Sequence, residues 1–292
     1  MRLLVTGGSG FLGGYVLREA ARRGHETVAL ARSAAAARAV ADRGAQPVTG
    51  DLDAADNLAE IFAAARCAAL VNLASLGFGH GPAIVAATQQ AGIRRAIFVS
   101  STAVTTSLAA PSKRVRLAAE QRIGESGLDW TILRPTMIYG AQGDRNLSRL
   151  LALLSRARML PVPGGRHLQQ PVHVADVAGA VLAAAERAGA AGSCYDVAGP
   201  EPLTFAELLR ISARAVASRT RFIPVPVMPL VAAARGYERL SRRPPKIRAE
   251  QLLRLAEDKA FAIRDAERDL DYAPRPFAAG IRAEAEAMGL AR

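Results

Sequence analysis

The stretch that decides the fold is Leu3-Leu4-Val5-Thr6-Gly7-Gly8-Ser9-Gly10-Phe11-Leu12-Gly13, close to the start of the chain. Its apolar beginning predicts a buried strand, and the amphipathic pattern from Phe11 onward predicts a helix. The spacing Gly7-x-x-Gly10-x-x-Gly13 suits a tight turn, a close approach of a pyrophosphate to the backbone, and close packing of helix on strand. Amides of the first helical turn would face the phosphates. We therefore predict a dinucleotide site that includes Thr6, Gly7, Gly8, Ser9, Gly10, Phe11, Leu12 and Gly13.

The same alternation of strand and helix continues through the first half of the chain. Short β-rich runs are separated by amphipathic stretches that end near a glycine, as helices often do. This order predicts a parallel sheet with helices on both faces, a Rossmann-like doubly wound α/β fold. The expected strands are 3–6, 27–31, 46–49, 69–73, 96–100 and 130–133, and the expected helices are 11–23, 34–43, 54–65, 81–91 and 112–126.

The second half of the chain is less regular, because proline and glycine cluster between its helical stretches. We expect those helices near 145–156, 174–188, 204–217 and 246–258. The prediction is a dinucleotide-binding core over residues 1–140. Residues 141–292 are expected to form mostly a smaller, mixed substrate lobe, with some segments returning to the core.

The end of the second expected strand indicates which dinucleotide is bound. A carboxylate there would favour the ribose hydroxyl of NAD, whereas an arginine favours a 2′-phosphate. This chain has Arg32 and Ser33 at that point. A guanidinium and a hydroxyl can both donate to a phosphate. We therefore expect NADP(H), with NAD(H) as the alternative.

Composition and charge place few further limits on function. Half of the residues are hydrophobic, and the formal net charge is +12, with 35 arginines among the 38 basic residues. The arginines are spread along the chain without a zinc-finger, helix-turn-helix or aromatic RNA-binding motif, so we expect no nucleic-acid partner. The histidines have no metal-ligand spacing, so we expect no metal. Cys67 and Cys194 lie in apolar surroundings and are expected to be buried free thiols.

The chain shows no signal-peptide pattern at its start, which favours a cytoplasmic protein. The longest late apolar run, 225–234, is interrupted by prolines and is too short to span a bilayer. It lies in a basic stretch, 219–248, for which two interpretations remain. One is a helix that contacts an anionic membrane surface; the other, which we favour, is a helix of the substrate lobe with solvated arginines.

Further motifs resemble those of the short-chain dehydrogenase/reductase superfamily, in its extended and atypical branch with the NAD-dependent epimerase/dehydratase family. The resemblance covers nearly the whole chain, through 50–52, 73–75, 98–102, 133–140, 171–178 and 270–276. It implies that Asp51 and Leu52 touch the adenine and that Leu73, Ala74 and Ser75 line the adenosine ribose. It also implies that the nicotinamide side is formed by Ser100, Thr102 as the active-site hydroxyl, and Pro135. Tyr139 follows in the same loop and is a candidate to supply the proton.

The superfamily's oxidoreductases use a tyrosine and a lysine four residues apart on one helix. No tyrosine of this chain has a lysine four residues later. The resemblance places Ser112 at the tyrosine position and Arg116 at the lysine position, where Arg116 would also touch the nicotinamide ribose. Serine is a poor proton donor, and losing a general acid costs on the order of a hundredfold to ten-thousandfold in rate.

The resemblance therefore leaves two functions open. The first is an NADP(H)-dependent oxidoreductase, or an epimerase/dehydratase-like enzyme, acting on a small carbonyl, alcohol or sugar-like substrate. The second is a dinucleotide-binding sensor or assembly protein without turnover. The helices at 81–91 and 112–126 often form a dimer interface in this superfamily, so a homodimer is also implied.

Overall fold

The computed structural model describes residues 1–108, 110–140, 144, 146–240 and 249–291. It divides into two compact units, each built from three segments of the chain. Unit 1 contains 1–138, 172–198 and 262–274, and unit 2 contains 139–171, 199–261 and 275–292.

Unit 1 is built on a seven-stranded parallel sheet, as the alternating pattern predicted. The strand order is β11-β6-β5-β4-β1-β2-β3. Leu3 pairs with Thr27 on one side and with Ala69 on the other, so β1 lies inside the sheet and reverses the order of the strands. The bounds are β1 Arg2–Thr6, β2 Glu26–Ala31, β3 Gln46–Thr49, β4 Ala69–Asn72, β5 Arg95–Val99, β6 Asp129–Pro135 and β11 Ser193–Val197.

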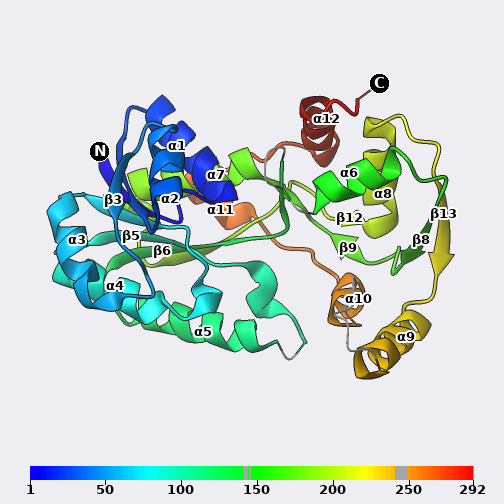
Figure 1. Ribbon diagram of the computed structural model, residues 1–292, viewed down its shortest axis with the longest axis horizontal. Coiled ribbons are helices and arrows are strands. Elements are labelled where there is room, and N and C mark those ends of the chain that lie inside the picture. The colour runs from blue at the N-terminus through cyan, green and yellow to red at the C-terminus, as the bar shows by residue number, and fades with distance from the viewer. Residues whose placement is uncertain (109, 141–143, 145, 241–248, 292) are drawn as a thin grey trace. The chain divides into compact units, whose positions relative to one another are not determined.

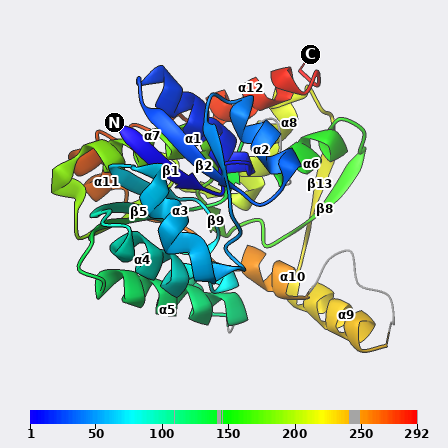
Figure 2. The ribbon, with the colours of Figure 1, turned by 60° about the vertical axis from the view of Figure 1, so that its left-hand side comes forward.

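Helices cover both faces of this sheet. One face carries α3, α4 and α5, and the opposite face carries α1 and α7, which pack on each other (Figures 1 and 2). The central strands are buried on both sides, which explains their continuous apolar runs. The helices are α1 Phe11–Arg22, α2 Ala34–Ala41, α3 Leu58–Ala65, α4 Gly81–Gln90, α5 Pro111–Gly124, α7 Val174–Glu186 and α11 Arg264–Leu270. Four short 3₁₀ turns accompany them: η1 Ala55–Asn57, η2 Leu76–Phe78, η3 Thr102–Thr105 and η4 Ala188–Ala190.

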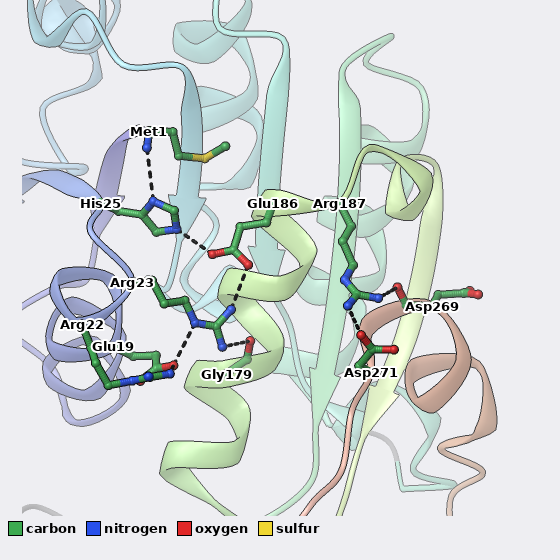
Figure 3. Close-up of polar contacts among 10 residues, drawn as sticks. All are labelled: Met1, Glu19, Arg22, Arg23, His25, Gly179, Glu186, Arg187, Asp269 and Asp271. Carbon is green, nitrogen blue, oxygen red and sulfur yellow. Dashed lines mark hydrogen bonds and ion pairs between the residues drawn. The ribbon is translucent and has the colours of Figure 1, made fainter.

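Two late segments of the chain return to unit 1 and are held there by ion pairs (Figure 3). Glu186, at the end of α7, accepts from Arg23 at 2.9 Å and from His25 at 2.6 Å. Arg187 pairs with Asp271, which follows α11. These contacts join α1 to α7 and α7 to α11, although such partly exposed pairs are individually worth no more than about 1 kcal/mol.

Unit 2 contains short strands and helices. β8 pairs in parallel with β13, and β9 pairs antiparallel with β12. Helix α12 packs on α6 and α8, and α9 packs on α10. The bounds are α6 Leu147–Leu154, β8 Met159–Pro163, β9 Leu168–Gln169, β12 Leu203–Thr204, α8 Phe205–Ala215, β13 Arg221–Val225, α9 Val227–Leu240, α10 Ala249–Leu255 and α12 Phe277–Ala287; β7 Ile138–Tyr139 and β10 Val172–His173 lie at segment ends.

Three expectations about residue environment can now be compared with the structure. Cys67 is half-buried, but Cys194 is exposed, so the expectation of a buried thiol is wrong there; Cys194 lies on β11, at the edge of the sheet.

Within the described part of the chain, no helix is long and apolar enough to cross a membrane, and no cluster of three potential metal ligands occurs. The proposed membrane stretch 219–248 is described only to Leu240, and the start of the expected helix 246–258 also lies outside the described residues.

Candidate dinucleotide site

The glycine loop has the geometry of a phosphate cradle. Gly7 adopts a φ of +70°, and Gly10 N–H donates to the Gly7 carbonyl at 3.0 Å, which closes the turn before α1. A Cβ at Gly13 would lie 2.3 Å from the Gly7 carbonyl oxygen, so only glycine fits against the loop there. The first turn of α1, beginning at Phe11 and Leu12, thus opens directly toward the loop with its free amides.

Buried polar contacts join the loop to the neighbouring strand β4. The Thr6 hydroxyl donates to Asn72 Oδ1 at 2.6 Å, and Asn72 Nδ2 donates to the Ala74 carbonyl at 3.0 Å. Thr6 and Asn72 are both fully buried. A Cβ at Gly7 would lie 2.9 Å from the backbone of Leu73 and Ala74, so these two loops touch through backbone alone. Through Asn72, Thr6 therefore fixes the position of the loop after β4, which forms one wall of the site.

A pocket of about 390 Å³ opens at this edge of the sheet, within unit 1. It brings together residues from the ends of the four neighbouring strands β4, β1, β2 and β3, as expected for a switch point in a doubly wound sheet. Nine of the residues predicted from the sequence line it: Gly7, Ser9, Gly10, Arg32, Asp51, Leu52, Leu73, Ala74 and Ser75.

Sequence reasoning assigned no cofactor role to several residues at the pocket. Asp53 and His80 also line it and face each other at 3.6 Å, and Phe78 is 79% exposed beside them. Arg43 lies behind the loop and donates to the Gly8 carbonyl at 2.8 Å. Arg43 follows α2 with no recognisable motif, so no signal in the sequence could have identified it. Ser33 is not among the lining residues and caps α2 by accepting from Ala36 N–H at 3.2 Å.

The degenerate catalytic positions lie on α5, next to the same pocket. Arg116 donates to the Ser112 carbonyl at 3.3 Å and to Ser75 Oγ, a pocket residue, at 3.5 Å. A Cβ at Gly77 would lie 2.9 Å from the Arg116 guanidinium, so glycine at that position makes room for it. The positive charge of Arg116 is therefore held beside Ser75, a residue of the pocket lining, and Ser112 lies one helical turn away.

An ion pair fixes helix α5 on the sheet. Arg134 on β6 donates to both carboxylate oxygens of Glu120, at 3.2 and 2.6 Å. Glu120 is 7% exposed, and its hydrogen bonds hold the pKa of Arg134 above its usual value. Because Glu120 lies one turn beyond Arg116 on the same helix, this pair sets the position of Arg116.

The strand ends β5 and β6 carry the remaining predicted residues of unit 1. The Thr102 hydroxyl is 8% exposed and donates to the Pro135 carbonyl at 3.3 Å. Ser100 directly follows β5, and its buried Oγ has no hydrogen-bond partner among the described residues. A buried hydroxyl without a partner is costly, so Ser100 is suited to contact a bound ligand.

Tyr139 belongs to unit 2, and its surroundings favour a packing role. Its ring is 1% exposed and lies edge-on to Phe277 of α12, with ring centroids 5.3 Å apart. A Cβ at Gly280 would lie 2.1 Å from the phenol oxygen, so the hydroxyl is pressed against α12. The catalytic role predicted for Tyr139 gains no support from this placement.

The site in unit 1 fits a dinucleotide. It combines a glycine cradle, which a Cβ at Gly7 or Gly13 would fill, with the N-terminus of α1. It also has the buried Ser100 hydroxyl, which has no hydrogen-bond partner among the described residues, and the exposed Arg32. The cradle would hold the pyrophosphate, the pocket residues would hold the adenosine, and Arg116 would lie near the nicotinamide end, as the resemblance implies.

Comparison with known proteins agrees with this geometry. Residues 7–188 match the family described as NAD(P)H-binding. A ketoreductase of Stigmatella aurantiaca that acts on a farnesyl dihydroquinoline oxide is 30% identical over 94% of this chain and 92% of its own. The 2-alkyl-3-oxoalkanoate reductase of Stenotrophomonas maltophilia is 27% identical over 94% and 95%.

Solved structures show the same fold. The UDP-glucose 4-epimerase of Thermotoga maritima superposes with a TM-score of 0.77 over 99% of both chains, at 16% identity. The expectation of a dinucleotide-binding protein with a Rossmann-like fold is thus confirmed. The chain belongs to the NAD(P)H-binding family, and its structural neighbours include epimerases of the kind that its motifs resemble.

Proposed function

We propose that the chain is an NADPH-dependent reductase of ketones. The observation that carries the proposal is the glycine-cradled pocket of unit 1, with Arg32 at its rim and Arg116 held at its wall. Support for the reaction comes from the two relatives that match along nearly the whole chain, since both are named as reductases of keto compounds. The reaction would consume NADPH, a ketone and a proton and yield NADP⁺ and an alcohol.

The preference for NADPH rests on the charges around the adenosine end. Arg32 is exposed and directly follows β2, where a 2′-phosphate is read in this fold. Asp51 accepts the Asp53 N–H at 3.1 Å, Asp53 faces His80, and among the described residues neither carboxylate forms an ion pair with Arg32. Arg32 can therefore meet a phosphate with charge-assisted hydrogen bonds.

The chain's own residues would orient the reacting groups. Reduced nicotinamide, when bound, supplies the hydride. Arg116 maintains a positive charge at the pocket wall, which favours the negative charge that develops on the carbonyl oxygen. The Ser112 hydroxyl, one turn away on the same helix face, can hydrogen-bond the substrate oxygen or a water that delivers the proton.

A second candidate function is a dinucleotide-binding protein without turnover. It is favoured by the residues at the two catalytic positions, since neither the Ser112 hydroxyl nor the Arg116 guanidinium is a good proton donor at neutral pH. The same pocket would then serve as a sensor of the NADPH level, with the ligand bound but not consumed.

Calorimetric titration with NADPH and NADH tests the cofactor. Replacing Arg32→Ala should weaken NADPH about tenfold or more and leave NADH unchanged, because only NADPH carries the 2′-phosphate. Arg38→Ala is the matched control, since Arg38 is an exposed arginine of α2 that does not line the pocket. Equal losses for both dinucleotides with Arg32→Ala would refute the NADPH preference.

Turnover is tested by NADPH oxidation with 2-undecanone and with 3-oxododecanoate. Oxidation that depends on the ketone and is lost in Arg116→Met supports the reductase. Tight NADPH binding without oxidation by either ketone would support the non-catalytic function instead. Absence of NADPH and NADH binding would refute both.

A further inference from the structure

Unit 2 contains a cavity of about 630 Å³, larger than the nucleotide pocket of unit 1. Its walls come from the ends of the paired strands β8 and β13, the first turns of α8 and the start of α9. Between β8 and β9 the chain makes a turn closed by His167 N–H on the Gly164 carbonyl at 3.0 Å, and this turn forms one rim. A volume of this size is typical of small-molecule sites.

The lining of this cavity restricts the chemistry of its ligand. Most of it is apolar, with Val162, Leu209, Phe222, Val225 and Val227 among the residues concerned. None of the described lining residues carries a carboxylate, an amide or a hydroxyl. A sugar or a nucleobase needs such paired donors and acceptors, because burying its polar groups without partners is unfavourable. An apolar chain has no such requirement.

The polar side chains of the lining are all basic. Arg166 comes from the turn and Arg210 from α8, and both are exposed at the cavity. Glu207 feels the charge of Arg210, but its carboxylate is engaged in capping α8 through Thr204 at 2.7 and 2.9 Å. The Nδ1 atom of His167 lies 3.3 Å from Oδ1 of Asp258. The two guanidinium groups therefore remain available for an anion.

We propose that this cavity binds an amphipathic carboxylate, with its alkyl chain against the apolar walls and its carboxylate at Arg166 and Arg210. This inference rests on the proposed function, because it makes the substrate a ketone that carries a long alkyl chain and an acidic group. Each further methylene buried should raise affinity about fourfold until the cavity is filled.

Direct binding tests the cavity without the dinucleotide. We would titrate the full-length chain with octanoate, decanoate, dodecanoate, 1-dodecanol and UDP. The expected results are an affinity that rises from octanoate to dodecanoate, dodecanol at least tenfold weaker than dodecanoate, and no measurable UDP binding. Tighter binding of UDP than of dodecanoate would overturn the inference in favour of a nucleotide site. Equal binding of dodecanol and dodecanoate would overturn the role of the arginines.

Two variants and a control locate the site. Ala206→Phe fills the cavity from α8 and should abolish dodecanoate binding. The double variant Arg166→Gln with Arg210→Gln changes two exposed side chains, so it should weaken dodecanoate binding at least tenfold without affecting folding. Arg214→Gln, on the same helix but outside the lining, should have no effect. Unchanged dodecanoate binding in the double variant would refute the proposed site.

The two proposals fail in distinguishable ways. Dodecanoate binding by a chain that binds no NADPH would refute the proposed function and leave the cavity assignment standing. NADPH binding and ketone reduction without any affinity for dodecanoate would support the proposed function and overturn the cavity assignment. NADPH affinity measured in each variant reports on unit 1 and should equal that of the unchanged chain.

Discussion

A buried carboxyl group in unit 2 should make the stability of the protein depend on pH. Glu284 lies on α12, is 1% exposed, and has its pKa raised to about 8, first by burial and then by the negative charge of Asp144. Asp144 in turn accepts the backbone N–H groups of Asn146 at 2.7 Å and Leu147 at 2.9 Å, at the start of α6. Glu284 is therefore protonated at neutral pH in the folded chain.

The sign and size of the effect follow from linkage. In the unfolded chain Glu284 loses its proton near pH 4.5, whereas in the folded chain it keeps the proton until about pH 8. The contribution to stability is complete below pH 4.5 and is lost as the pH rises through 8, by up to about 1.4 kcal/mol per pH unit. The full span corresponds to at most about 5 kcal/mol.

The substitution Glu284→Gln tests this directly, because the amide keeps the shape of the carboxyl group and carries no charge at any of these pH values. Urea unfolding at several pH values between 5 and 9 should show the unchanged chain losing stability with rising pH and the variant losing much less. The two curves should cross, so that the variant is the more stable at pH 9. Glu286→Gln, on the exposed side of the same helix, is the control and should follow the unchanged chain. Parallel curves for the unchanged chain and Glu284→Gln would refute the reasoning.

Two further substitutions test the site in unit 1. Gly13→Ala forces a Cβ to within 2.3 Å of the Gly7 carbonyl oxygen and should weaken NADPH binding, measured by calorimetry, at least tenfold. Gly14→Ala is the control and should have little effect, because its Cβ meets only the flexible end of the Arg43 side chain, at 2.9 Å. Equal losses of affinity in the two variants would contradict the packing argument. Glu120→Ala leaves the Arg134 charge without its buried partner and should lower the free energy of unfolding, measured in urea, by about 3 kcal/mol. The exposed Glu125→Ala is the control and should lower it by less than about 0.5 kcal/mol. A loss below about 1 kcal/mol in Glu120→Ala would show that the ion pair does not fix α5.

The sheet was predictable because its strands are buried on both faces. The expected strand 46–49 coincides with β3, and the other five differ from the observed ones by no more than two residues at either end. The seventh strand, β11, was not predicted, since it lies at the sheet edge and its polar and apolar residues mix over Ser193–Val197. Helices α11 and α12 were also missed, and both are short and rich in charged residues or alanine.

The nucleotide site could be predicted from the sequence where its backbone geometry requires glycine. A glycine that no other residue can replace leaves a visible spacing in the sequence, and Gly7, Gly10 and Gly13 lie where that spacing placed them. Side chains that reach the site from outside the motif leave no such trace. Arg43 lies just after the end of α2, and the cavity of unit 2 is assembled from three segments within 162–227 that are far apart in the sequence.

The position of Arg116 limits what the chain can contribute to a reduction. A guanidinium stays protonated throughout the range in which proteins work, so Arg116 can stabilise negative charge but cannot deliver a proton. Its contacts with the Ser112 carbonyl and the Ser75 hydroxyl orient that charge along the pocket wall. In the proposed reduction, Arg116 would therefore supply only the positive charge of the superfamily's tyrosine–lysine pair, and another group would have to supply the proton. Any reduction here must draw its proton through a hydroxyl or a water, and the Ser112 side chain, on the same face of α5, can hydrogen-bond such a water.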